Sequence, residues 1–213
     1  ASLPSGVTLN FPTQSGNLGL GVPGYALDAS LKEHNGSWRV GLDYQATSDV
    51  LLYANVSRGY KAGSFPVLAP SQIVSALPVN QESVTAYEAG IKASFMDRKV
   101  QFNAAGFYND YRNKQVKGKL YDFVFGTLDA LVNVPKSRIW GAEAQLTVRP
   151  IEGLTIDGSA TYLNSKVTKY YGYDIYGGIS NSNFVPGSPG NQEDLSGNPL
   201  PYPPKWSGAI NVD

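Results

Sequence analysis

The sequence predicts an all-β fold: an antiparallel, up-and-down segment of a transmembrane β-barrel with about seven strands. Three observations predict it. Apolar and polar residues alternate along stretches of about 9–12 residues, the length that a tilted strand needs to cross a bilayer. Tight and long connections between these stretches alternate strictly. Aromatic side chains recur at one height on the apolar side.

The amino-acid composition excludes several classes of function. The chain has 213 residues, with 17 basic and 17 acidic side chains and no net charge, so it lacks the basic excess of a nucleic-acid-binding protein. It has no cysteine and a single histidine, His34. These counts exclude thiol catalysis, zinc–thiolate sites and multi-histidine metal sites. We therefore expect that the protein is not an enzyme and that it binds no cofactor and no metal ion.

The strands are expected at about 37–46, 50–60, 84–95, 100–111, 138–149, 154–164 and 205–213. The fifth stretch illustrates the pattern, because Trp140, Ala142 and Ala144 alternate with Glu143 and Gln145. One face of each strand is apolar and the other is polar. A soluble antiparallel sheet also alternates, so this pattern alone leaves the surrounding medium open.

The connections favour a membrane barrel. Tight turns are expected at 47–49, 96–99 and 150–153, and long connections at 61–83, 112–137 and 165–204. In an up-and-down sheet, all tight turns then lie at one edge and all long loops at the other. This is the arrangement of outer-membrane barrels, with short turns on the periplasmic side and long loops outside.

The aromatic girdle, as we call the recurring aromatic residues, has five members at the long-loop end of the apolar face: Trp38, Tyr108, Trp140, Tyr162 and Trp206. Tyr60 and Tyr87 fit this row less closely. Such rings suit the boundary between hydrocarbon and headgroups. The alternative is that they are core aromatics of a soluble sheet, which would be expected at mixed heights.

Five segments carry a family resemblance: LYANVSRGYKAGSF (52–65), ESVTAYEAGIK (82–92), NAAGFYNDY (103–111), NVPKSRIWGAE (133–143) and PLPYPPKWS (199–207). In this order and spacing they resemble the barrel of TonB-dependent outer-membrane receptors of the iron-complex type. The resemblance covers about 36–213, and residues 1–35 are expected to form an outer loop or lead-in segment. We recognise no plug domain and no closing barrel strands in the sequence.

The resemblance implies bacterial outer-membrane localisation and TonB-dependent uptake of a scarce ligand, most commonly a ferric siderophore complex. The implied partners are outer-membrane lipid and lipopolysaccharide, a ferric chelate or other small ligand, the receptor's own plug, and the TonB complex. Two alternatives stay open. One is a passive porin-like channel, and the other is a soluble β-sandwich or adhesin-type carbohydrate-binding module.

Candidate site residues follow from this interpretation. Ligand-binding candidates at the outer end are Arg58, Lys61, Tyr121, Tyr170, Tyr171, Tyr173 and Tyr176. Candidates that face the barrel lumen and the plug are Glu88, Lys92, Glu143, Arg149 and Asp157. The alternative for the tyrosines is loop packing, and for the lumen charges mutual ion pairing on a solvated face. Arg58 has the parity of the apolar face, so it also suits lipid phosphates.

Overall fold

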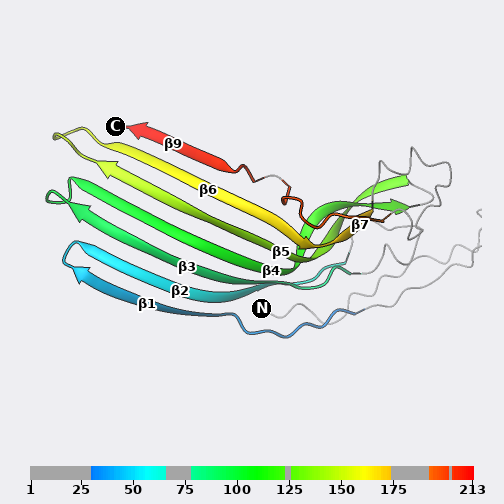
Figure 1. Ribbon diagram of the computed structural model, residues 1–213. Helices are drawn as coiled ribbons and strands as arrows, with labels where there is room; N and C mark the ends of the chain where they lie inside the picture. The colour runs from blue at the N-terminus through cyan, green and yellow to red at the C-terminus, as the bar shows by residue number, and fades with distance from the viewer. Residues whose placement is uncertain (1–29, 66–77, 123–125, 174–191, 202) are drawn as a thin grey trace, which may run out of the picture.

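The computed structural model describes residues 30–65, 78–122, 126–173, 192–201 and 203–213, and these form one curved sheet of seven strands and a small sheet of two strands (Figure 1). The strands are β1 (Trp38–Thr47), β2 (Val50–Lys61), β3 (Glu82–Phe95), β4 (Val100–Asp122), β5 (Gly126–Val148), β6 (Ile156–Lys169), β7 (Tyr171–Tyr173), β8 (Gln192–Asp194) and β9 (Trp206–Val212). Among the described residues, no helix is long and apolar enough to cross a membrane.

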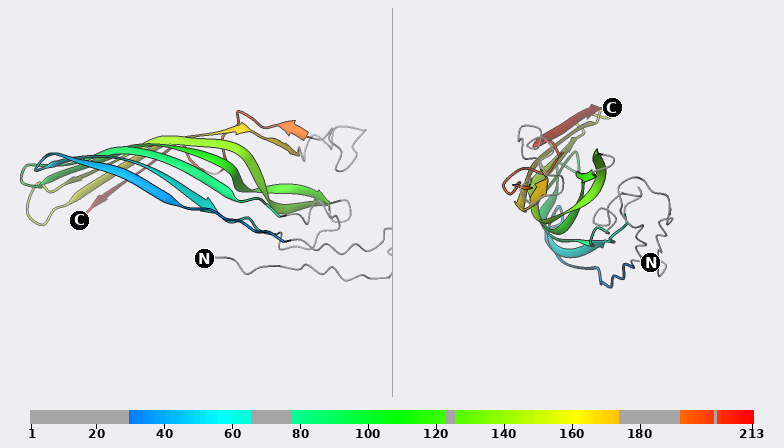
Figure 2. Two further views of the ribbon diagram at one scale, coloured as in Figure 1. Left: turned by 90° about the horizontal axis from the view of Figure 1, so that it is seen from below. Right: turned by 90° about the vertical axis from the view of Figure 1, so that its right-hand side faces the viewer.

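The main sheet has seven antiparallel strands in the order β1-β2-β3-β4-β5-β6-β9, which confirms the predicted up-and-down segment. Strands β7 and β8 pair with each other in the connection between β6 and β9. Figure 2 shows the strongly curved profile of the sheet from two further directions.

The three tight turns lie together at one edge of the sheet, as predicted (Figure 1). In the turn at 96–99, Met96, Asp97 and Arg98 have positive φ angles of 54°, 53° and 64°, and the Lys99 N–H donates to the Met96 carbonyl at 3.0 Å. In the turn after β5, Gly153 has a φ of +81°, a conformation that favours glycine. The long connections begin and end at the opposite edge of the sheet.

The strand register aligns the apolar positions of all seven strands. One row of directly opposed residues runs across the whole sheet through Tyr44, Leu52, Ile91, Ala104, Ala144, Ala160 and Gly208. A slip of one residue in any strand would have moved its apolar set to the other side. The apolar face is therefore continuous, and so is the polar face behind it.

Large apolar side chains on the apolar face are exposed within this chain. Leu42 is 78 % exposed and Ile210 is 81 % exposed. In the part of the chain that the structure describes, a buried apolar cluster lies at the outer end of the sheet, where Val134, Val167 and Leu200 pack together. A continuous exposed apolar face of this extent requires a nonpolar neighbour, and lipid provides it.

The structure differs from the prediction in the connection at 112–137. Instead of an irregular loop, β4 and β5 continue as a paired hairpin of 23 residues each, with Asp122 opposite Gly126. Asn113 interrupts β4 with a φ of +50°, and Pro135, which has no N–H to donate, lies across from it. The extension beyond this point, residues 113–122 and 126–135, is called the β4–β5 arm below.

Candidate functional site

The polar face contains a depression of about 570 Å³ that crosses five neighbouring strands, β2 to β6. Its polar lining side chains include Tyr53, Lys92, Asn103, Glu143, Gln145, Ser159 and Thr161. Each has the parity of the polar face in the observed register. Two of the predicted lumen residues, Lys92 and Glu143, therefore lie in one depression although they are far apart in the sequence.

Glycine makes room for aromatic rings on this face. A Cβ atom added to Gly90 would lie 2.6 Å from the ring atoms Cε1 and Cζ of Tyr53. Tyr53 therefore lies flat across Gly90 on the adjacent strand, and the Lys92 ammonium is 5.8 Å from the centre of its ring. Phe107 lies over Gly141 in the same manner, with its Cζ 3.0 Å from the Cβ position. These contacts place the two aromatic rings directly against the backbone of the neighbouring strand.

The other predicted lumen residues have separate environments. The Asn55 amide donates to the Glu88 carboxylate at 3.4 Å, and the Thr147 hydroxyl donates to Asp157. Arg149 follows the last residue of β5, at the tight-turn edge, where its backbone N–H donates to the Lys99 carbonyl at 2.7 Å.

No ion pair joins Glu88, Lys92, Glu143, Arg149 and Asp157 in the part of the chain that the structure describes. The alternative of mutual ion pairing is therefore not observed among these five side chains. Within the sheet, Glu88 and Asp157 instead accept hydrogen bonds from the neutral side chains of Asn55 and Thr147.

The outer end of the sheet holds a hydrogen-bonded network that the sequence patterns did not indicate. Glu82 is 9 % exposed and accepts the backbone N–H of Gln115 at 2.8 Å, and its other oxygen lies 3.6 Å from the Lys114 ammonium. The Gln115 side chain donates to the carbonyls of Ala62 and Asn80. The network therefore ties the β4–β5 arm to both ends of the connection between β2 and β3.

Asn133 completes this network from β5. Its amide donates to the carbonyls of Asn80 at 3.0 Å and Asn113 at 2.8 Å, and its oxygen accepts the Asn80 N–H at 2.7 Å. Asn133 is the first residue of the NVPKSRIWGAE segment. Its place in a segment that resembles the family was the available sign in the sequence that this residue has a special role. Glu82 and Gln115 had no comparable signal, because buried polar contacts between distant segments leave no periodic pattern.

The predicted ligand-binding residues do not gather at one place among the residues described. Tyr170 packs against the Val134–Val167–Leu200 cluster, and burial raises the pKa of its phenol. Tyr171 is 59 % exposed on β7, opposite Asp194, and Lys61 ends β2 opposite Glu82. Tyr121 and Tyr173 have described backbone positions only, on β4 and β7, and Tyr176 lies outside the described residues.

Arg58 lies on the apolar face, opposite Trp38. Its Nε donates to the Tyr60 hydroxyl at 2.8 Å, its Nη1 donates to Thr85 Oγ1 at 3.3 Å, and its Cζ is 5.4 Å from the centre of the Tyr60 ring. These contacts hold the guanidinium on the side of the sheet that faces away from the polar depression.

All five residues of the aromatic girdle share the apolar face. The centroid of the Tyr162 ring lies 5.6 Å from that of Trp140 and 4.7 Å from that of Trp206. Tyr87, which fitted the row less closely in the sequence, lies directly opposite Tyr108 with ring centroids 6.3 Å apart. From β1 to β9 the girdle residues step in one direction relative to the rows of directly opposed residues. This is expected when the strands are tilted, because residues at one height above the membrane centre are then not directly opposed.

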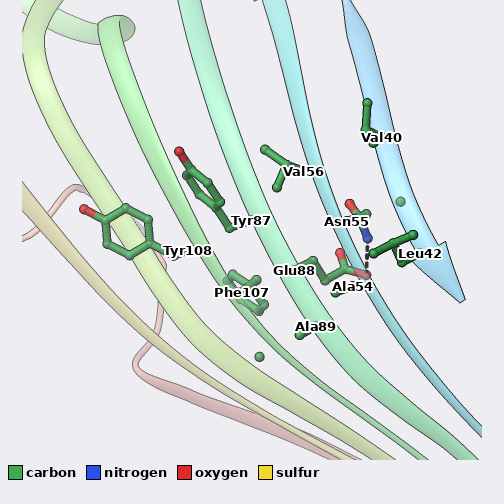
Figure 3. A pocket seen from close by; sticks show the side chains of 12 residues that line it. Val40, Leu42, Ala54, Asn55, Val56, Tyr87, Glu88, Ala89, Phe107 and Tyr108 are labelled. Atoms are coloured by element: carbon green, nitrogen blue, oxygen red, sulfur yellow. Dashed lines mark hydrogen bonds between the residues drawn. The ribbon is translucent and has the colours of Figure 1, made fainter. Parts of the chain in front are cut away.

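Below this row the apolar face carries a groove of about 570 Å³ across β1 to β4. Figure 3 shows Tyr87 and Tyr108 on one side of it and Val40 and Leu42 on the other. Small residues, Ala54, Ala89 and Gly106, are directly opposed across β2, β3 and β4 and form its floor. The groove opens on the side of the sheet that faces lipid.

The described residues contain no group of three or more His, Cys, Asp or Glu side chains that could hold a metal ion.

Comparison with known proteins agrees with this geometry. The family described as TonB dependent receptor-like, beta-barrel matches residues 6–213. The metal-pseudopaline receptor CntO of Pseudomonas aeruginosa is 26 % identical over 134 residues, which cover 62 % of this chain and 17 % of that protein.

Two solved structures share the fold. The ferric yersiniabactin uptake receptor FyuA from Yersinia pestis matches with a TM-score of 0.57 and 20 % identity, over 82 % of this chain and 22 % of that one. The siderophore receptor PiuA from Acinetobacter baumannii matches with a TM-score of 0.56 and 19 % identity, over 83 % of this chain and 23 % of that one. This chain spans less than a quarter of the length of each of these proteins.

The family match covers nearly the whole chain, and its members are barrels of the bacterial outer membrane. The register, the exposed apolar face and the aromatic girdle are what such a barrel wall requires. The chain belongs to the TonB-dependent receptor β-barrel family.

Proposed function

We propose that this chain is part of the wall and outer loops of a receptor that takes up a ferric siderophore complex across the outer membrane in a TonB-dependent manner. The observation that carries the proposal is the polar depression across β2 to β6, which lies behind a continuous apolar face. In a barrel, a face of this kind is turned toward the lumen.

The lumen residues are proposed to contact a plug domain. Lys92 and Glu143 lie in the depression, and Glu88 lies beside it, opposite Asn55. Because these charges are not ion-paired with one another, they are available to hydrogen-bond groups of a plug, with a strength that depends on how far water is excluded.

Ligand contact is proposed for the outer end, through Lys61, Tyr121, Tyr171, Tyr173 and Tyr176. Tyrosine presents a large amphipathic surface at a small entropic cost, which suits organic chelates. Tyr170 is proposed to support these residues through its packing against Leu200. The Glu82–Gln115–Asn133 network gives the β4–β5 arm a fixed base from which to contact a ligand.

The test measures accumulation of radioactive iron, supplied as hydroxamate, catecholate and aminocarboxylate chelates, in cells that produce the full-length protein. We expect accumulation of at least one chelate, and we expect it to disappear in cells that lack TonB. Accumulation that persists without TonB would indicate a passive channel. Membership of the TonB-dependent receptor β-barrel family rules out the soluble carbohydrate-binding alternative.

A second candidate cargo is a chelate of another metal, because the curated relative is named a metal-pseudopaline receptor. The same cells are therefore also given radioactive nickel and zinc with an aminocarboxylate chelator. Uptake of nickel or zinc without uptake of any ferric complex would contradict the ferric siderophore as cargo and support this second cargo.

A further inference from the structure

The β4–β5 arm leaves the wall of the sheet at one defined line. The ladder between β3 and β4 ends at Ser83 and Arg112, and the ladder between β5 and β6 ends at Lys136 and Lys169. Arg112 and Lys136 are directly opposed, and in the part of the chain that the structure describes β4 and β5 pair only with each other beyond them. The arm is therefore a hairpin with its own ladder, and its base lies where both neighbouring ladders stop.

Asn113 and Pro135 lie at this base and have the properties of a hinge. They lie across from each other between two regular pairs, and the register of the β4–β5 ladder passes over both of them. Asn113 has a φ of +50°, and Pro135 has no N–H to donate. A rotation of the arm about these two residues would therefore leave the ladder of the wall and the ladder of the arm intact.

The arm leans over the polar face of the sheet. Lys114 follows Arg112 by two residues, and in an uninterrupted strand it would share the apolar side with Arg112. Its ammonium instead lies 3.9 Å from the centre of the Tyr111 ring and 3.6 Å from the Glu82 carboxylate, and both of these residues have the parity of the polar face. The positive φ of Asn113 thus turns the arm toward the polar face, and the right-hand view of Figure 2 shows the arm on the concave side of the sheet.

Three side chains, Glu82, Gln115 and Asn133, hold the arm in this position, and we call them the polar clamp. The Gln115 amide donates to the carbonyls of Ala62 and Asn80 at 2.8 Å and 3.1 Å. Asn133 exchanges two hydrogen bonds with the backbone of Asn80, and Glu82 accepts the N–H of Gln115. A joint made of such side-chain bonds can open without unpairing any strand, whereas a joint made of ladder bonds cannot.

In this position one hydroxyl group is buried without a partner. Ser137 has the parity of the polar face, opposite Tyr111 and Val167, and it is 0 % exposed. Over the residues described, its Oγ has no hydrogen-bond partner. Val134 of the arm and Leu200 pack against Val167, so the arm is part of what covers the polar face here. Burial of an unpartnered hydroxyl opposes the clamped position, because water reaches the hydroxyl only when the arm lifts.

We infer that the β4–β5 arm is a hinged lid over the outer end of the polar face. It turns as one unit about Asn113 and Pro135, between the clamped position and a lifted one. The polar clamp and the apolar contacts of Val134 favour the clamped position, and the buried hydroxyl of Ser137 favours the lifted one. Lifting uncovers Tyr111 and Ser137 and opens this part of the polar face to solvent. The lid is a property of the arm, so it does not depend on which ligand the receptor carries.

The first test measures how fast a water-soluble thiol reagent modifies Ser137→Cys in the full-length protein in detergent micelles, with any other cysteine replaced by serine. A thiol at this buried position is reached only when the arm lifts. We expect Gln115→Ala/Asn133→Ala to speed the modification at least about tenfold, because each hydrogen bond removed from the clamp contributes a factor of about two to ten to the equilibrium. The matched control, Lys117→Ala/Leu131→Ala, truncates a directly opposed pair two residues farther along the arm and should leave the rate unchanged.

Amide hydrogen exchange shows whether the arm moves as a unit. In Gln115→Ala/Asn133→Ala, the amide of residue 115, which is bonded to Glu82 in the clamped position, should exchange faster than in wild type. The ladder amides of residues 116–118 and 130–132 should keep their wild-type protection, because the arm's own ladder stays paired when it turns. Equal loss of protection along the whole arm would show that the hairpin unravels, and this would overturn the hinged lid.

A second variant shifts the balance in the opposite direction. Ser137→Ala removes the unpartnered hydroxyl, so the clamped position gains and exchange of the Gln115 amide should slow several-fold. Ser165→Ala is the control on β6, because the Ser165 Oγ already accepts the Leu200 N–H at 3.0 Å, and it should not slow this exchange. Equal modification of Ser137→Cys in the clamp variant and its control, or wild-type exchange in Ser137→Ala, would each overturn the inference.

Discussion

The ring of Tyr162 on β6 packs against the indole of Trp206 on β9, with 4.7 Å between their centroids. The two residues are directly opposed in the register, although the whole connection that contains β7 and β8 separates them in the sequence. This contact places β9 beside β6 and continues the aromatic girdle onto the last strand.

Trp206→Ala removes this contact and one interfacial anchor. We expect a loss of about 1 kcal/mol in the free energy of unfolding, since an aromatic pair contributes about 0.5–1.5 kcal/mol beyond its buried area. Urea unfolding of the full-length protein in liposomes measures it. Trp206→Tyr should retain most of the stability, and Lys205→Ala, on the other face, should be neutral. Equal losses in Trp206→Ala and Lys205→Ala would contradict the assignment of Trp206 to the girdle.

Gly90→Ala tests the packing of the polar face. The new methyl group would lie 2.6 Å from the Tyr53 ring and 2.6 Å from the Ala104 carbonyl oxygen. We expect a loss of about 1–3 kcal/mol, typical of overpacking, by the same unfolding measurement. Gly158→Ala is the control, because nothing lies within 4 Å of its Cβ position and the change should be neutral or favourable. If Gly90→Ala is as well tolerated as the control, the Tyr53 contact is not as described.

Glu82→Ala tests the network at the base of the β4–β5 arm. It leaves the buried N–H of Gln115 without its acceptor, which costs about 1–3 kcal/mol. We expect faster amide hydrogen exchange in the peptide that contains Gln115 and unchanged exchange in β6. Glu82→Gln keeps an acceptor and should have the smaller effect. Unchanged exchange near Gln115 in Glu82→Ala would show that the network does not hold the arm.

Labelling on intact cells tests the orientation. Met96 is 75 % exposed at the tight-turn edge, and Tyr171 is 59 % exposed at the opposite end. A membrane-impermeant maleimide should label Tyr171→Cys and leave Met96→Cys unlabelled until the outer membrane is opened. The reverse pattern would place the tight turns outside.

Much of the sheet could be predicted because each face meets a different medium. Trp140, Ala142 and Ala144 alternate with Glu143 and Gln145, and this contrast predicted the strand and the face on which each residue lies. The β4–β5 arm was missed because the contrast ends there. Beyond Arg112, both faces of β4 carry polar side chains, because Lys114 and Gln115 are adjacent in the sequence. The positive φ of Asn113 also interrupts the extended backbone there.

The candidate site was predictable only in part. Lys92 and Glu143 were assigned to the lumen by parity alone, and the register brings them to one depression. The Glu82 network joins segments that are distant in sequence, so neither periodicity nor a local motif predicts it.

The most direct test of the account compares two adjacent residues on β5. The chain contains no native cysteine, so once any cysteine elsewhere in the full-length protein is replaced by serine, Ala144→Cys and Gln145→Cys can each carry a single nitroxide label in liposomes. The account predicts that the label at 144 is reached by oxygen dissolved in lipid, and that the label at 145 is reached by a water-soluble nickel chelate. Equal accessibility at both positions, or the reverse order, would contradict a sheet with one face toward lipid and the other toward the lumen.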